Sequence, residues 1–346
     1  MYGIGILGNC CTHGAGAAAQ ANNHPKTDLI TGFEGQSRRG HELAEAMGVP
    51  LASGYDEVIH HPDIQILIVT SNPCDKADLI EKAAAAGKAI FVNKPLCHSP
   101  EDAKRIVRAI EKHETPAVFD APMIKGISAY DCLLKRVRAG EFGRIINYHH
   151  SFGMLFDQDF PIAKRWPERF DPPSVSGGGE MTNMGCYAID FALRMLGLPL
   201  GIQARSQTFW EPYSASNVEN FGQILLDYGS YWAMLTVGKQ TTTEPRSHRN
   251  ALTIEFETGN IFLDAQAGVL MYNGASLSLD TFVGNHQPVS AMDQLIASLE
   301  KGSLPESDIY TAARGVDVLC AGYQSVIDGQ PVDFPMQEPV NPLFER

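Results

Sequence analysis

Short apolar runs that alternate with helical patterns constrain the fold of this chain more than any other feature. Strands are predicted at YGIGILG, DLITGFE, QILIVT, KAIFV and PAVFDA, and helices follow them, for example over residues 76–86 and 100–112. The predicted strands are apolar throughout, which indicates burial on both faces and therefore a parallel sheet with helices on either side. The first part of the chain is predicted to be an α/β domain.

The pattern changes after residue 121. Beyond a helix over 128–138, the predicted strands RIINYHHSFG, FGQILLDY, SYWAMLTVG, ALTIEFET and GNIFLD follow one another, which indicates an antiparallel or mixed sheet. A glycine-rich segment at 173–197 leads into a helix, and another long helix is predicted over 305–327. Because 346 residues exceed the usual size of one compact core, we expect two domains, 1–121 and 122–346.

Charge and composition exclude several classes of partner. The formal net charge of −13 would repel nucleic acid and anionic bilayers over most of the surface. The chain lacks an apolar run of about 18 residues and starts directly with a strand, so we expect a cytoplasmic protein with no membrane role. Its 7 cysteines are scattered and form no CxxC pair, which is typical of reduced thiols.

A glycine turn after the first strand is the predicted cofactor site. The literal GxGxxG match, Gly3 to Gly8, lies within the strand and cannot cradle a phosphate. The turn must instead follow Leu7, where the loop is one residue longer than the usual fingerprint and lacks its middle glycine. A helix N-terminus there would still favour phosphate, helped by polar side chains, although a plain strand-to-helix turn stays open. The predicted dinucleotide contacts are Gly8, Asn9, Cys10, Thr12, His13 and Gly14.

Glu34 ends the second predicted strand and bears on the choice of cofactor. A carboxylate at this place accepts hydrogen bonds from a ribose 2′-hydroxyl and repels a 2′-phosphate, which favours NAD over NADP. Arg38 and Arg39 lie close enough in sequence to weaken this preference.

Two further motifs resemble the Gfo/Idh/MocA oxidoreductase family. The fourth strand ends in Asn93-Lys94-Pro95-Leu96, where the family has EKPL. The segment Gly177 to Asp190, GGGEMTNMGCYAID, is similar to the family's GGGxxxDxGxHxxD. The resemblance extends over nearly the whole chain, including TSNP after the third strand and AARGVDVLCAGYQSVIDGQPVDFP near the end.

The resemblance implies a Rossmann domain that binds NAD, followed by an α+β domain with an open, mostly antiparallel sheet that often forms oligomer interfaces. It further implies a sugar, polyol or glycoside substrate in a cleft between the domains, and a homodimer or homotetramer. Lys94 matches the family's catalytic lysine, Asn183 its aspartate and Tyr187 its histidine, and tyrosine is similar to the glucose-fructose oxidoreductase branch. Further cofactor contacts are then expected at Ser71, Asn72, Asn93, Lys94 and Pro95.

The chemistry of an alcohol dehydrogenase suits these residues. Oxidising a hydroxyl needs a base, and a tyrosine near its ordinary pKa of about 10 needs help from a neighbouring cation such as Lys94. Asn183 and Tyr187 are four residues apart, so on one helix they would share a face. We therefore predict that Tyr187 transfers the proton, Lys94 assists it, and Asn183 holds a neighbouring hydroxyl.

Several alternatives remain open from the sequence. Arg165 and Arg169, before the glycine loop, are candidate substrate contacts, although such residues often only cover a domain seam. The Cys10, Cys11 and His13 group and the paired histidines have no spacing that converges on a metal, so no metal is expected, and His248 is not assigned to the site. Transient oxidation in a glycoside-cleaving or eliminating enzyme, or a non-catalytic sugar or NAD sensor, are the rival functions.

Overall fold

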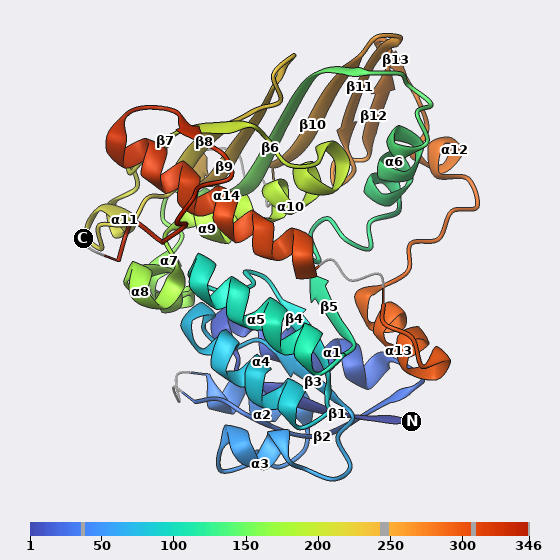
Figure 1. The fold of residues 1–346 in the computed structure, drawn as a ribbon, viewed down its shortest axis with the longest axis vertical. Helices are drawn as coiled ribbons and strands as arrows, with labels where there is room; N and C mark the ends of the chain where they lie inside the picture. The colour runs from blue at the N-terminus through green and yellow to red at the C-terminus, as the bar shows by residue number, and fades with distance from the viewer. Residues whose placement is uncertain (36–38, 243–248, 306–308, 345–346) are drawn as a thin grey trace. The chain divides into compact units, whose positions relative to one another are not determined.

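The structure is a computed structural model that describes residues 1–35, 39–242, 249–305 and 309–344, so that Arg38 and His248 lie outside the described residues. Two compact units are formed (Figure 1). The first contains residues 1–120, 175–177 and 290–313, and the second contains residues 121–174, 178–289 and 314–346. The two domains expected at 1–121 and 122–346 would fold independently, which the compact units do not test, so that boundary stays a prediction.

The sheet of the first unit is parallel, as the unbroken apolar strands predicted. Its order in the described residues is β2-β1-β3-β4-β5, and every neighbouring pair is parallel. The strands are β1 (Tyr2–Leu7), β2 (Thr27–Phe33), β3 (Ile66–Val69), β4 (Ala89–Asn93) and β5 (Ala117–Asp120). This confirms the predicted Rossmann-type α/β class for the first part of the chain.

Helices cover the sheet of the first unit. One face packs against α1 (His13–Asn23), α2 (Gly40–Met47) and α13 (Ala291–Lys301), whereas α3 (Tyr55–Ile59), α4 (Lys76–Ala85) and α5 (Pro100–Lys112) complete the unit. The residues at the start of α5 explain why the helix begins there. Ser99 Oγ accepts a hydrogen bond from the Asp102 amide, and Pro100 occupies the first turn, where no amide hydrogen is needed.

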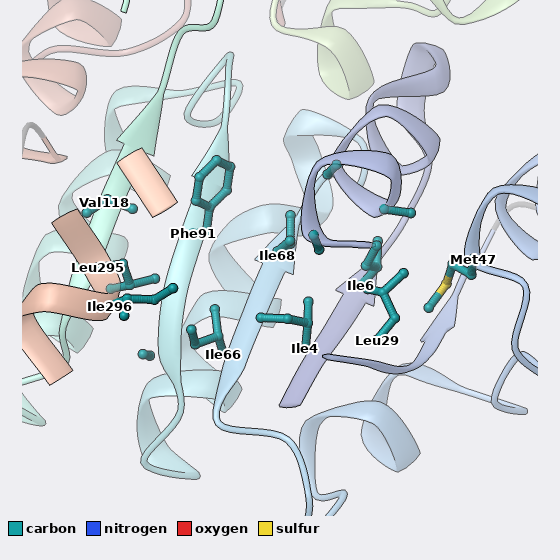
Figure 2. Close-up of a cluster of buried hydrophobic side chains, with 14 of the residues drawn as sticks. Ile4, Ile6, Leu29, Met47, Ile66, Ile68, Phe91, Val118, Leu295 and Ile296 are labelled. Atoms are coloured by element: carbon teal, nitrogen blue, oxygen red, sulfur yellow. The ribbon is translucent and has the colours of Figure 1, made fainter. Parts of the chain in front are cut away.

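Helix α13 belongs to the core of the first unit although it follows strands β6 to β13 of the second sheet in sequence. Its Leu295 and Ile296 are buried and lie beside Val118, Phe91 and Ile66 of the parallel sheet (Figure 2). The apolar side chains of β4 and β5 on this face are therefore covered by a segment from late in the chain.

The second unit is built on a mixed, mostly antiparallel sheet, which confirms the predicted α+β class. Its order in the described residues is β13-β12-β11-β10-β6-β9-β8-β7-β14, with β6 and β9 parallel and the other neighbouring pairs antiparallel. The strands are β6 (Ile145–Asp157), β7 (Gly201–Gln207), β8 (Phe221–Asp227), β9 (Trp232–Thr242), β10 (Arg249–Phe256), β11 (Gly259–Asp264), β12 (Val269–Tyr272), β13 (Ala275–Ser276) and β14 (Val332–Asp333).

One face of this sheet packs against helices. Tyr148, His150 and Phe152 alternate along β6 toward the core, where the ring of Phe191 lies 6.0 Å from that of His150 and 5.5 Å from that of Tyr130. The helices in or entering this unit are α6 (Ser128–Arg138), α7 (Ile162–Arg165), α8 (Pro173–Ser176), α9 (Glu180–Asn183), α10 (Gly185–Leu196), α11 (Glu211–Ser214), α12 (Leu279–Val283) and α14 (Ile309–Asp328).

His150 makes the stability of the second unit sensitive to acid. Its ring is fully buried, with Nε2 2.8 Å from Asn250 Oδ1, and desolvation lowers its pKa to about 4. Because the unfolded chain binds the proton more tightly, lowering the pH from about 7.5 to about 5 should reduce the free energy of unfolding by about 2 kcal/mol through this group. Urea unfolding followed by tryptophan fluorescence measures this unit alone, since Trp166, Trp210 and Trp232 all lie in it.

The His150→Gln variant keeps a hydrogen-bond donor for Asn250 but does not titrate in this range. We expect its free energy of unfolding to change by about 2 kcal/mol less than that of the wild type over the same pH interval. Equal pH dependence in the two proteins would show that His150 does not cause the acid sensitivity.

Candidate functional site

The carboxyl ends of the five parallel strands bring most of the predicted cofactor residues to one edge of the first sheet. Gly8 follows β1, Glu34 follows β2, Ser71 and Asn72 follow β3, and Asn93 ends β4. The strand order reverses at β1 and β3, which is the switch point where open α/β sheets bind their ligands. The first unit therefore places these side chains where a nucleotide would be expected.

The loop from Gly8 to Gly14 needs both of its outer glycines. Gly8 has φ +92°, and a Cβ there would collide with Ser71 Cα. A Cβ on Gly14 would collide with the carbonyl oxygen of Gly8. Between them, Cys11 and Thr12 have φ values of 52° and 69°, left-handed conformations that a β-branched residue such as Thr12 rarely adopts. The two glycines allow the loop to lie against Ser71, just after β3, in a tight strand-to-helix turn.

Asn9 ties this loop to two helices. Its side chain is buried, Oδ1 accepts from the Ala15 amide of α1 at 2.9 Å, and Nδ2 donates to the Arg39 carbonyl at 3.1 Å. The Asn9 amide also donates to Glu34 Oε2. The Asn9 side chain, expected to help bind phosphate, therefore also organises the loop, and Thr12 is the exposed polar side chain of the turn.

Other predicted residues of this loop are half-buried. The amide of Cys10 donates to the Thr70 carbonyl at 2.9 Å, and its Sγ lies 3.8 Å from Cys11 Sγ. His13 is the first residue of α1. The structure thus places Cys10 and His13 on the same turn as Thr12.

Glu34 is half-buried beside the loop, as a ribose-binding carboxylate would be. The amide of the next residue, Gly35, donates to Tyr55 Oη at 3.2 Å, and burial together with the Glu34 charge raises the pKa of Tyr55. Arg39 directs Nη1 to both carboxylate oxygens of Glu42, each at 2.9 Å. The Arg39 guanidinium is therefore already engaged with a carboxylate of its own helix.

The turn that carries Lys94 lies at the end of β4. Asn93, Lys94 and Pro95 are buried, the Lys94–Pro95 peptide is cis, and the Lys94 amide donates to the Asp120 carbonyl at 3.1 Å. Asn93 Nδ2 lies 3.4 Å from Asp120 Oδ2, whereas Asn93 Oδ1 is buried with no hydrogen-bond partner among the described residues. An unpaired buried acceptor is costly, so this oxygen is suited to a donor on a bound molecule.

In the second unit, the helix expected after the glycine loop is broken. Asn183 is the last residue of α9, Tyr187 lies in α10, and Met184 separates them. The Tyr187 amide donates to the Met184 carbonyl at 3.3 Å, and Cys186 Sγ lies 3.4 Å from the Asn183 carbonyl. The expectation of one continuous helix through Asn183 and Tyr187 is therefore wrong, because α9 ends at Asn183 and α10 begins at Gly185, whereas a shared face stays a prediction.

Tyr187 and Asn183 are both buried in this unit. The Tyr187 ring lies 5.0 Å from the Phe152 ring, so the aromatic part of the side chain is held by packing. Asn183 Nδ2 donates to Glu180 Oε2 at 2.7 Å. The amide of Asn183 is thus oriented by a carboxylate that the sequence did not single out.

Glu180 is the centre of a buried polar cluster. Its Oε1 accepts from Tyr213 Oη at 2.7 Å and from Lys239 Nζ at 3.0 Å. Desolvation opposes ionisation of Glu180, but Lys239 and Arg169 outweigh it and lower the pKa of this carboxyl. The structure therefore brings Arg169 near Asn183 through Glu180, whereas Arg165 is exposed at the end of α7.

Glu219 explains why residue 179, just before α9, is a glycine. Its carboxylate accepts from the Gly179 amide at 3.1 Å, from the Met181 amide at 2.9 Å and from Tyr323 Oη at 2.7 Å. A Cβ on Gly179 would collide with the Glu219 carbonyl, and burial raises the pKa of the Glu219 carboxyl to about 7. Glu219 lies far along the sequence, so no local signal indicated this role.

The described residues show neither a metal-binding cluster nor a membrane-spanning helix. No group of three or more His, Cys, Asp or Glu side chains in the described ranges is placed to hold a metal ion. In the same ranges, no helix combines the length and the apolar character needed to span a membrane.

The fold of the first unit and its glycine turn are those of a Rossmann-type NAD-binding domain. Residues 2–119 match the family model of oxidoreductases with an NAD-binding Rossmann fold, and residues 131–262 match the GFO/IDH/MocA C-terminal domain. The chain belongs to the Gfo/Idh/MocA oxidoreductase family.

Curated relatives and solved structures include enzymes that act on sugars and inositols. The chain is 30% identical over 179 residues to scyllo-inositol 2-dehydrogenase (NAD(+)) of Bacillus subtilis (strain 168), covering 46% of this chain and 52% of the relative. It is 32% identical over 152 residues to D-xylose dehydrogenase of Paenarthrobacter nicotinovorans, covering 42% and 37%. The chain thus spans about half or less of these relatives. The structure of levoglucosan dehydrogenase with NADH and levoglucosan superposes with a TM-score of 0.77 at 16% identity, covering 97% of this chain and 100% of that one.

Proposed function

We propose that this protein is an NAD-dependent oxidoreductase that transfers a hydride between a hydroxyl-bearing carbon of a sugar or polyol and nicotinamide. The observation that carries the proposal is Lys94 at the carboxyl end of β4, on the sheet edge that also holds the Gly8 to Gly14 turn. Family membership and the named activities of the relatives support the substrate class.

The proposed roles of the second-unit residues follow from their chemistry. Tyr187 accepts the hydroxyl proton, Lys94 favours the phenolate by its positive charge, and Asn183 holds a neighbouring hydroxyl. Bound NAD would supply the hydride acceptor. Because Asn183 donates to the ionised Glu180, its side-chain oxygen is directed by a fixed partner and suits a hydroxyl donor.

NAD is proposed over NADP because Glu34 lies beside the glycine turn. Its carboxylate is fixed at that turn by the Asn9 amide, where it would repel a 2′-phosphate. The pairing of Arg39 with Glu42 supports this choice, since it commits that guanidinium elsewhere. The cytoplasmic location and the homodimer or homotetramer remain predictions.

Two parallel measurements test the proposed function. Protein purified without added nucleotide is denatured, and any released nucleotide is identified by mass. The native protein is also screened with sugars and inositols in the presence of NAD or NADP, following the absorbance of reduced nicotinamide. We expect NAD in the released fraction or NAD-dependent reduction with at least one polyol. Failure to bind either nucleotide, with no reduction by any compound, would contradict the proposal.

A further inference from the structure

Lys76 is a buried lysine that contacts the turn carrying Lys94. It is the first residue of α4, and only 1% of its surface is exposed. Its Nζ donates to the Asn93 carbonyl and, at 2.5 Å, to the Pro95 carbonyl. The ammonium of Lys76 therefore bridges the two carbonyls on either side of Lys94.

A buried lysine at the first position of α4 does not stabilise that helix. Removing an ammonium from water is costly, and the N-terminus of a helix carries a partial positive charge that repels a cation. An apolar side chain of similar length would fill the same space without either cost. Two charge-assisted hydrogen bonds of Lys76, both made to the Asn93–Pro95 turn, offset part of these costs.

The turn is consequently held from two directions. On the β5 side, the Lys94 amide donates to the Asp120 carbonyl at 3.1 Å, and Asn93 Nδ2 lies 3.4 Å from Asp120 Oδ2. From α4, Lys76 donates to the carbonyls of Asn93 and Pro95. These bonds set the direction in which the main chain presents the Lys94 side chain.

We propose that Lys76 is a positioning residue, which acts on hydride transfer by holding the Asn93–Pro95 turn so that the Lys94 ammonium is aimed at the reacting hydroxyl. This inference rests on the proposed function, since it assigns Lys76 a role through Lys94. A displacement of about 1 Å at a catalytic group can cost about a hundredfold in rate, so the loss of two fixed carbonyls should be felt in kcat.

The test compares Lys76→Met with Lys88→Met. Lys88 is a matched control, because its Nζ also donates to two main-chain carbonyls of the first unit, His61 at 2.9 Å and Ile64 at 2.7 Å, before the start of β4. We expect Lys76→Met to lower kcat by about a hundredfold while NAD affinity, measured by calorimetry, changes less than about threefold. Lys88→Met should leave kcat within about twofold of the wild type, whatever it does to the melting temperature.

A double variant separates positioning from a general loss of structure. If Lys76 acts through Lys94, Lys76→Met combined with Lys94→Ala should have a kcat within about threefold of Lys94→Ala alone. Losses that multiply in the double variant, or a kcat of folded Lys76→Met within about twofold of wild type, would overturn the proposal. If Lys76→Met does not fold, Lys76→Gln, which keeps one donor group, is judged by the same criteria.

A structural readout keeps this inference separate from the proposed function. If the wild type shows no turnover, the proposed function fails, and the role of Lys76 is decided by crystal structures of the two single variants. We expect the carbonyls of Asn93 and Pro95 to move by about 1 Å or more in Lys76→Met and to stay in place in Lys88→Met. An unmoved turn in Lys76→Met would refute the positioning role even in an active enzyme.

Discussion

Replacing Tyr187 by phenylalanine should lower the single-turnover rate of nicotinamide reduction by about three orders of magnitude, because it removes the group proposed to accept the substrate proton. The aromatic ring remains, so its packing 5.0 Å from the Phe152 ring is preserved. Lys94→Ala should cause a loss of similar size, because it removes the cation proposed to favour the phenolate.

Tyr148→Phe is the matched control for this experiment. Tyr148 is likewise a buried tyrosine of the second unit, with Oη 3.5 Å from His150 Nδ1, but it has no proposed role in the reaction. Its turnover rate should stay within about threefold of the wild type. Rates within about tenfold of the wild type for both Tyr187→Phe and Lys94→Ala would remove these residues from the mechanism.

The parallel sheet could be predicted because its strands carry their own signal. Ile66, Leu67, Ile68 and Val69 of β3 are all buried, and an uninterrupted apolar run of this kind has few other solutions. The contribution of α13 to the same core was not predicted, because Leu295 and Ile296 follow β13 of the second sheet and lie far in sequence from the strands that they cover. Which core a helix enters depends on tertiary packing, and its local pattern does not encode that choice.

The candidate site also contains residues that the sequence predicts and residues that only the fold reveals. Gly8 and Gly14 were predicted from the turn that must follow β1, and the structure shows the close approach that excludes a Cβ at both. Met184 interrupts the helix between Asn183 and Tyr187, which spacing alone could not reveal. The roles of Lys76 and Lys239 were not predicted, because a lysine is normally exposed. Only the fold shows that each is buried and donates to specific oxygens.

The pair formed by Lys239 and Glu180 should be the most expensive to break in the second unit. Both side chains are almost fully buried, 3% and 1% exposed, with Lys239 Nζ 3.0 Å from Glu180 Oε1 and 5.2 Å from the Trp166 ring centroid. Lys239→Met removes the cation that contacts the buried Glu180 carboxylate and leaves the charge of Arg169 to stabilise it, so we expect the free energy of unfolding to fall by about 3–5 kcal/mol. Urea unfolding followed by tryptophan fluorescence would measure this loss.

An exposed ion pair and a double variant serve as controls for this prediction. Arg144 and Glu257 lie 3.1 Å apart, but their side chains are 71% and 49% exposed, so Arg144→Met should cost less than about 1 kcal/mol. Glu180→Gln combined with Lys239→Met should recover most of the lost stability, because neither member of the buried pair then carries a charge. A loss below about 1 kcal/mol for Lys239→Met alone would show that Glu180 becomes neutral without cost.

The Glu180→Gln, Lys239→Met double variant should be stable but should bind the substrate less well. Asn183 Nδ2 donates to Glu180 Oε2 at 2.7 Å, and a neutral glutamine there offers a weaker acceptor and adds an amide donor that can reverse its orientation. The second unit would therefore be folded while the Asn183 amide is no longer fixed. If Asn183 binds a substrate hydroxyl, the KM for the sugar should rise in this stable protein, which links the buried ion pair to substrate binding through the orientation of one amide group.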